Sequence, residues 1–240
     1  MTDMLLLKSA DEVNPEKLAR LLDNLNLKVS CISTGQIFAS LGLYFTQEDL
    51  ELRKKVLDVF SKLIYLAKDF GKIINIGRVR GFIAKGRTKE KAENLFIDMV
   101  NRLCDIADPL GVTIVVEPVN RYEINFINNL DEGSDLIKKV GYTNTGLMPD
   151  VFHMNIEDDN IGESIIRNGN LIKYIHFADS NRLAPGQGHI NFDEVFNALK
   201  KIQFNGWASI EILPKPDPDT AALQAAKFII PRIRNYNKLK

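Results

Sequence analysis

Four side chains of types that commonly bind metals stand where four short apolar segments end. The segments that begin at residues 112, 145, 171 and 207 end at Glu117, Asp150, His176 and Glu211, respectively. In a parallel α/β fold the carboxyl ends of the strands lie on one rim, where the chemistry gathers. We therefore expect these three carboxylates and one imidazole to converge on a single site.

A divalent cation explains this combination better than four separate structural roles do. A single carboxylate at a strand end is commonly a helix cap or an ion-pair partner, but that explanation would have to hold on four strands in succession. Burying three carboxylates together without a cation would cost on the order of several kcal/mol each. Three oxygen ligands and one imidazole suit Mn²⁺, Mg²⁺, Co²⁺ or Fe²⁺ better than an ion that prefers thiolates.

The segments that carry these residues belong to a regular alternation of strands and helices. Short runs rich in Ile, Val and Leu are typical of strands buried on both faces. The strands are expected at Met4–Leu7, Lys28–Ser33, Lys72–Gly77, Val112–Glu117, Thr145–Asp150, Leu171–Phe177 and Ala208–Leu213. Amphipathic segments predict helices at Pro15–Leu25, Gln47–Phe70, Lys89–Leu110, Phe192–Lys201 and Thr220–Arg232. The alternation predicts a parallel sheet with right-handed crossovers, and no Ser/Gly-rich linker divides residues 1–240, so one domain is expected.

The charge and the cysteine content exclude several classes of protein. Lys plus Arg and Asp plus Glu are equal at 31 each, so the formal net charge is zero. This balance argues against a nucleic-acid partner held by bulk positive charge. No apolar run reaches the length of a membrane span, so no membrane partner is expected. Cys31 and Cys104 form neither a zinc pattern nor a disulfide framework, and we expect reduced thiols in a cytoplasmic protein.

Three motifs carry a resemblance to a known family. Glu117-Pro-Val-Asn-Arg-Tyr-Glu123, Asp150-Val-Phe-His-Met-Asn-Ile-Glu157 and His176-Phe-Ala-Asp-Ser-Asn-Arg182 resemble segments of the xylose-isomerase-like sugar isomerases and epimerases. The likeness is nearest to the D-tagatose 3-epimerase group of ketose 3-epimerases. It continues through Pro185–His189 and Gly206–Glu211. The fold that it implies is an α/β barrel of the TIM (β/α)8 type.

The resemblance also implies a role for individual residues. The family's metal ligands fall on the four strand-end residues Glu117, Asp150, His176 and Glu211. Its substrate-binding residues fall on Glu123, His153 and Arg182.

The implied activity is metal-dependent epimerisation of a ketose at C3. A proton leaves the carbon beside the carbonyl, giving an enediolate, and returns to the opposite face. Glu117 and Glu211 are the expected catalytic pair, because two groups must handle the proton and these are the ligand carboxylates of equal reach. The metal stabilises the developing charge; Mn²⁺ is the expected ion, with Mg²⁺ and Co²⁺ as alternatives. The expected partner is a small-molecule sugar, and homo-oligomerisation is left open.

Several alternatives stay open. An aldose–ketose isomerase would move a proton between C1 and C2 with much the same residues. A sugar-binding relative that has lost catalysis would bind the sugar without exchanging its proton. An apurinic endonuclease would need several metals and a basic groove, whereas this chain has three histidines and no net charge. Arg78 and Arg80 follow the third strand and either bind a carboxylate or phosphate on the substrate, or carry solvated charge or form a salt bridge with an acidic neighbour.

The strand count departs from the family's pattern. A closed TIM barrel has eight strands, whereas seven are expected here. The family's chains place a strand and a helix before the segment that matches Met4–Leu7, and Leu5 stands where the family tends to have a glutamate. We therefore expect the first strand–helix unit to be absent. Met4–Leu7 and Ala208–Leu213 would then flank a gap or close on each other imperfectly.

Overall fold

The protein is described by a computed structural model that covers residues 2–237 and consists of parallel strands alternating with helices. The strands are β1 (Thr2–Leu6), β2 (Lys28–Ser33), β3 (Ile73–Ile76), β4 (Thr113–Val116), β5 (Thr145–Leu147), β6 (Tyr174–Phe177) and β7 (Trp207–Ile210). The helices are α1 (Pro15–Leu25), α2 (Gly35–Leu41), α3 (Leu50–Asp69), α4 (Lys89–Ala107), α5 (Leu130–Val140), α6 (Val151–Glu157), α7 (Ile161–Arg167), α8 (Phe192–Lys201) and α9 (Pro218–Asn237). Single 3₁₀ turns occupy Ala10–Glu12, Arg78–Arg80 and Asp108–Leu110.

The strands follow one another in space in the order of the chain. Strands β1 to β5 form one parallel sheet, and β6 pairs with β7. Two isolated parallel bridges, Leu147↔Ile172 and Asp150↔His176, join the two sheets and continue the curve. Sequential parallel order with a helix after each strand is the arrangement of a TIM barrel, as the sequence predicts. Within residues 2–237 no ladder connects β1 to β7. The absence of a first strand–helix unit stays a prediction.

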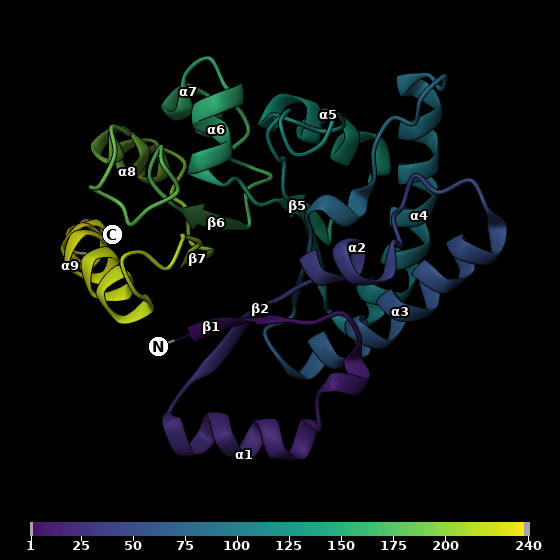
Figure 1. The fold of residues 1–240 in the computed structure, drawn as a ribbon, viewed down its shortest axis with the longest axis horizontal. Coiled ribbons are helices and arrows are strands. Elements are labelled where there is room, and N and C mark those ends of the chain that lie inside the picture. The colour runs from purple at the N-terminus through teal and green to yellow at the C-terminus, as the bar shows by residue number, and fades with distance from the viewer. Residues whose placement is uncertain (1, 238–240) are drawn as a thin grey trace.

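The helices surround the strands on the outside. Figure 1 shows them following one another around the strands from α1 through α3, α4 and α5 to α8 and α9. Several begin with a side-chain cap, because the first N–H groups of a helix lack partners inside it. Asn14, Asp49, Thr88, Asn129 and Asn191 each accept such an N–H with the side chain. No helix in the described part of the chain has the length and apolar character needed to cross a membrane.

The core has two layers, because alternate residues of a strand point to opposite faces of the sheet. One layer is a small cluster of buried side chains on the inside of the curve: Cys31, Ile73, Val115, Met148 and Tyr174. The other is larger and fills the space between the strands and the surrounding helices. The inner face of the strands therefore leads directly up to the rim where polar side chains gather.

The observed elements differ from the predicted ones at several ends. The first strand is Thr2–Leu6 rather than Met4–Leu7, and β4 and β5 end before Glu117 and Asp150, which lie just beyond the ladders. Helices α2, α6 and α7 have seven residues each, which is too short for a clear helical period, and none of them is among the predicted helices. Helix α5 is also absent from the prediction; it is longer, but Gly and Ser lie inside it.

The last helix extends beyond the predicted Thr220–Arg232. It starts at Pro218, continues past Pro231 and ends at Asn237. The hydroxyl of Tyr236 donates to the carbonyls of Leu199 and Phe204, which anchors the last turn against α8. This contact comes from residues distant in sequence, so helical periodicity does not predict it.

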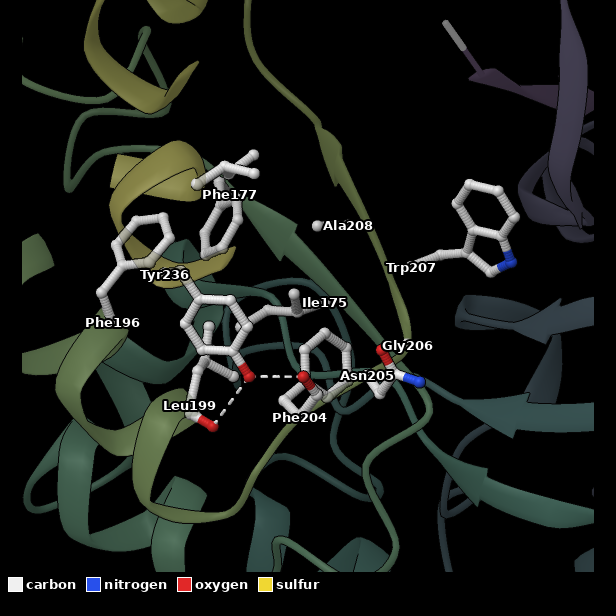
Figure 2. Close-up of a pocket in the computed structure, with 11 residues that line it drawn as sticks. Ile175, Phe177, Phe196, Leu199, Phe204, Asn205, Gly206, Trp207, Ala208 and Tyr236 are labelled. Atoms are coloured by element: carbon white, nitrogen blue, oxygen red, sulfur yellow. Dashed lines mark hydrogen bonds between the residues drawn. The ribbon is translucent and has the colours of Figure 1, made fainter. Parts of the chain in front are cut away.

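An apolar cavity of about 330 Å³ lies where β6 and β7 meet α8 and α9. Figure 2 shows the rings of Phe177, Phe196 and Tyr236 gathered on one side and Trp207 turned away from them. None of its lining residues is a candidate metal ligand or substrate-binding residue. This cavity is therefore separate from the polar rim.

The packing of Phe45 yields a prediction for stability. Its side chain is fully buried, with ring centroids 4.9 Å from Phe60 and 6.1 Å from Phe96. Phe45→Ala should lower the free energy of unfolding by about 3–5 kcal/mol, measured by urea denaturation, because it removes this packing and leaves a cavity. Leu50→Ala at the exposed start of α3 is the control, with an expected change within about 0.5 kcal/mol. A loss below about 1 kcal/mol for Phe45→Ala would contradict this account.

Candidate metal and active site

Four candidate metal ligands lie at the carboxyl ends of β4 to β7. Glu117 and Glu211 directly follow β4 and β7, His176 lies in β6, and Asp150 precedes α6. Each offers one ligand atom, and these atoms all lie within 4.8 Å of one another. The structure thus brings together the four side chains that the sequence places at strand ends.

His176 lies between the two glutamates. Its Nδ1 is 3.4 Å from Oε1 of Glu117 and 3.3 Å from Oε2 of Glu211. Burial favours the neutral imidazole, but the hydrogen bonds and charges of both glutamates outweigh it and raise the pKa of His176 well above its usual value. The two carboxylates differ in exposure, because the side chain of Glu117 is 9% exposed and that of Glu211 is 45% exposed.

Asp150 is fully buried, and one of its oxygens lacks a partner. Oδ1 accepts the N–H of Phe152 at the start of α6, whereas Oδ2 has no hydrogen-bond partner among the described residues. Burial and the charge of Glu211 raise the pKa of Asp150 well above its usual value. A divalent cation would supply the charge and the bond that this oxygen lacks. Three carboxylates and an imidazole therefore fit an ion that binds oxygen and nitrogen ligands.

Arg182 connects the cluster to Glu123. Its guanidinium lies 3.0 Å from Oε2 of Glu211 and 3.1 Å from Oε1 of Glu123, and it stands 4.9 Å above the ring of Phe152. Although burial opposes it, the hydrogen bond and charge of His176 and the charge of Arg182 lower the pKa of Glu211 well below its usual value. Of the expected substrate-binding residues, Arg182 thus contacts a candidate metal ligand directly, and Glu123 is joined to the cluster through Arg182.

A carboxylate that the sequence analysis does not single out shapes the loop bearing Arg182. Asp179 accepts the backbone N–H groups of Ser180, Gly186 and Ile190. Burial opposes ionisation of Asp179, but these backbone hydrogen bonds lower its pKa. The backbone of Arg182 adopts a left-handed conformation with φ of 58°, and its N–H donates to the carbonyl of Asp179. The loop therefore holds the guanidinium over the site.

His153, the third expected substrate-binding residue, is oriented by Asn120. Its Nδ1 lies 2.7 Å from Nδ2 and 3.4 Å from the backbone nitrogen of Asn120. Because both groups donate, Nδ1 accepts and the proton lies on Nε2. Burial lowers the pKa of His153, which favours this neutral form. Nε2 lies 3.7 Å from Oδ2 of Asp150, so its N–H lies beside the cluster.

Asn75 also contacts the cluster, and the sequence analysis misses it. It lies in β3, where its Nδ2 donates to Oε2 of Glu117 at 3.0 Å. The sequence carries one sign of this contact, since Asn75 is the single polar residue in the otherwise apolar strand Ile73–Ile76. An amide inside a buried strand suggests a specific polar partner.

Arg80 has none of its predicted roles. It is fully buried, and its guanidinium donates to the carbonyls of Gly77, Phe126 and Ile127 at 2.7–2.9 Å. Burial lowers its pKa to about 9, so it stays charged at neutral pH. The expectations of anion binding, solvated charge and a salt bridge are all wrong for Arg80, because backbone carbonyls after β3 and β4 satisfy its donors. Arg78, by contrast, is 43% exposed and lies 4.0 Å from Glu123.

Loss of this guanidinium should loosen the loop that follows Glu117. Arg80→Met keeps much of the apolar stem but removes all three side-chain hydrogen bonds; the carbonyls of Gly77 and Ile127 keep a backbone N–H donor, whereas that of Phe126 loses its side-chain donor. The free energy of unfolding should fall by about 3 kcal/mol, since hydrogen bonds to charged groups contribute about 1.5–3 kcal/mol each. Urea denaturation tests this, with Arg78→Met as the matched control that should change stability by less than about 0.5 kcal/mol. Equal stability of the two variants would show that the hydrogen bonds of Arg80 do not stabilise this loop.

The cluster should bind one divalent cation. A crystal soaked in Mn²⁺ should show a single ion about 2.0–2.4 Å from its oxygen and nitrogen ligands. Asp150→Asn should weaken Mn²⁺ binding by at least about 100-fold, because it removes a charged ligand, while Asp159→Asn on the exposed loop should not. Binding should weaken as pH falls, because His176 must lose its proton before it can bind the ion. Ligand side chains that point to different places in the soaked crystal would disprove the site.

Comparison with known proteins identifies the family. A family model described as "Xylose isomerase-like TIM barrel" matches residues 3–232. The chain is 36% identical over 115 residues to a D-psicose 3-epimerase of Agrobacterium fabrum, covering 48% of this chain and 40% of that protein. It is 31% identical to a ketose 3-epimerase of Arthrobacter globiformis, covering 65% of this chain and 52% of that protein. The matched region thus spans about half or less of these relatives' length.

A solved structure of D-allulose 3-epimerase from Methylomonas sp. extends the similarity to the fold. It superposes with a TM-score of 0.85 at 25% identity, covering 95% of this chain and 86% of that chain. The sequential parallel strands and the family match over residues 3–232 agree with this similarity of fold. The chain therefore belongs to the xylose isomerase-like TIM barrel family.

Proposed function

We propose that this protein is a metal-dependent ketose 3-epimerase, an isomerase whose substrate is a small sugar. The observation that carries the proposal is the pair of glutamates, Glu117 and Glu211, that face the same imidazole nitrogen within a four-ligand cluster. Inverting a carbon beside a carbonyl requires one group to remove a proton and a second to return it on the other face. The ketose 3-epimerases among the relatives support this assignment.

The cation and the location of the protein are part of the same proposal. Glu117, Asp150, His176 and Glu211 would hold the cation, which would act as a Lewis acid toward the carbonyl and neighbouring hydroxyl of the sugar. We assign Mn²⁺ because the cluster offers oxygen and imidazole ligands and no thiolate. A cytoplasmic location is supported by the two cysteines, which are free and buried.

The protein's own side chains divide the remaining work. One glutamate accepts the C3 proton and the other donates a proton to the opposite face, and the two exchange roles when the reaction reverses. The Nε2–H of His153 and the guanidinium of Arg182 bind sugar oxygens near the reacting carbon. Glu123 accepts a hydrogen bond from Arg182 and limits its movement.

Deuterium uptake tests the proposed reaction. Incubation of a panel of free ketoses with the protein and Mn²⁺ in D₂O should place deuterium at C3 and generate the C3 epimer, both visible by NMR. Deuterium at C1 of the ketose would indicate aldose–ketose isomerisation instead. Sugar binding without any exchange would indicate a relative that has lost catalysis. Either result would overturn the 3-epimerase proposal.

Replacing either catalytic glutamate should stop turnover. Glu117→Gln and Glu211→Gln should each lower kcat by about 10²–10⁴-fold, the usual contribution of a general acid or base. Mn²⁺ affinity must be measured alongside, because both residues are also proposed ligands. Glu163→Gln on the exposed face of α7 is the control and should keep full activity. A loss below about tenfold in either glutamate variant, with the metal bound, would argue against its role in proton transfer.

A further inference from the structure

Asn75 is a polar residue on the inner face of a strand whose other residues are apolar. It is 3% exposed and pairs in register with Val115, which belongs to the inner cluster. Neighbouring Ile74 and Ile76 belong to the outer core beneath the helices. Asn75 therefore points toward the inside of the curve, directly below the rim.

The amide of Asn75 is only half satisfied, which argues against a role in stability. Its Nδ2 donates to Oε2 of Glu117 at 3.0 Å. Its Oδ1 is buried and has no hydrogen-bond partner among residues 2–237. A buried carbonyl oxygen without a partner is unfavourable, and an apolar residue of the same shape would avoid that cost. The amide is thus best explained by what it does to Glu117.

Gly77 opens the space that the carboxylate of Glu117 occupies. It directly follows β3, just beyond the paired residues Ile76 and Val116. A Cβ built on Gly77 would stand 3.0 Å from Oε2 of Glu117 and 4.0 Å from Nδ2 of Asn75. Any side chain here would press on the same oxygen that Asn75 binds. The glycine and the amide therefore act on one atom from two sides.

We propose that Asn75 and Gly77 form a cradle that fixes the orientation of the Glu117 carboxylate, with Asn75 as a positioning residue; this inference rests on the proposed function. Asn75 holds Oε2, which leaves Oε1 facing Nδ1 of His176 at 3.4 Å. Glu211 is held differently, by the charged guanidinium of Arg182 at 3.0 Å from its Oε2. A neutral donor thus orients one catalytic carboxylate and a cationic donor the other.

The decisive variant is Asn75→Leu, which keeps the approximate shape and removes the donor. We expect its melting temperature in the presence of Mn²⁺ to change little, because the loss of the unpartnered Oδ1 offsets the loss of one donor to Oε2 of Glu117. Its Mn²⁺ dissociation constant, followed by electron paramagnetic resonance, should rise by about tenfold, and kcat for C3 exchange should fall by about 10–100-fold with little change in KM. A crystal structure of the variant should show the carboxylate of Glu117 rotated out of the cradle.

Two further variants separate this effect from general damage to the barrel. Gly77→Ala should lower kcat in the same direction as Asn75→Leu, because its Cβ displaces Oε2 from the other side. Thr145→Val is the matched control: it removes a buried hydroxyl of β5 that donates to the carbonyl of Tyr142, and it should leave metal affinity and kcat unchanged.

The outcomes distinguish the cradle from the proposed reaction. If Asn75→Leu binds Mn²⁺ and exchanges C3 as the unmodified protein does, the cradle is refuted and the epimerase proposal stands. If Asn75→Leu weakens Mn²⁺ binding but the unmodified protein exchanges no ketose proton, the cradle is supported as an orienting device for a ligand and the reaction is refuted. A large fall in melting temperature for Asn75→Leu would show a structural role and overturn the inference.

Discussion

Electrostatic repulsion at the rim is the constraint around which this molecule is organised. Three carboxylates meet one imidazole with all ligand atoms within 4.8 Å, and Asp150 is completely buried. Such an arrangement is unstable unless positive charge or donors surround it. The start of α6 holds one oxygen of Asp150, Asn75 holds Glu117, and Arg182 holds Glu211. Each of these contacts comes from a different segment, so the fold must assemble before the site exists.

The two proposed proton carriers have unequal access to water. The side chain of Glu117 is 9% exposed, whereas that of Glu211 is 45% exposed. A proton accepted by Glu211 can therefore exchange with solvent readily, while one accepted by Glu117 is shielded. In the proposed epimerase the product takes its new proton from the donating glutamate, so deuterium from the solvent would enter the product sooner when Glu211 donates than when Glu117 donates. The asymmetry follows from the positions of the strands, because β4 lies inside the sheet and β7 pairs only with β6 among the described residues.

The sequence predicts the architecture and the four-residue cluster well, for a physical reason. Buried parallel strands must be apolar, so a charged residue at the end of such a run stands out, and the topology brings all strand ends to one rim. Arg80 shows where this reasoning fails. An arginine at the rim has the same sequence pattern whether it faces the substrate or turns inward to the carbonyls of Phe126 and Ile127. In the sequence Asn75 stands out only as a polar residue in an apolar strand, because the contact that explains it crosses from β3 to Glu117.

Glu211 directly follows β7, so the binding of an ion to Glu211 is coupled to the local stability of this strand. Trp207 and Ile210 of this strand are 38% and 37% exposed, and strands with few buried contacts open at a lower free energy than the whole domain. Opening of β7 would carry Glu211 away while Glu117 stayed in place at the end of β4, which lies between β3 and β5. An ion that binds only the closed arrangement must then tighten this strand by mass action. Amide hydrogens of β7 would exchange more slowly as the ion concentration rises, while those of β3 would barely respond. The bound ion would then raise the local stability of this side of the barrel.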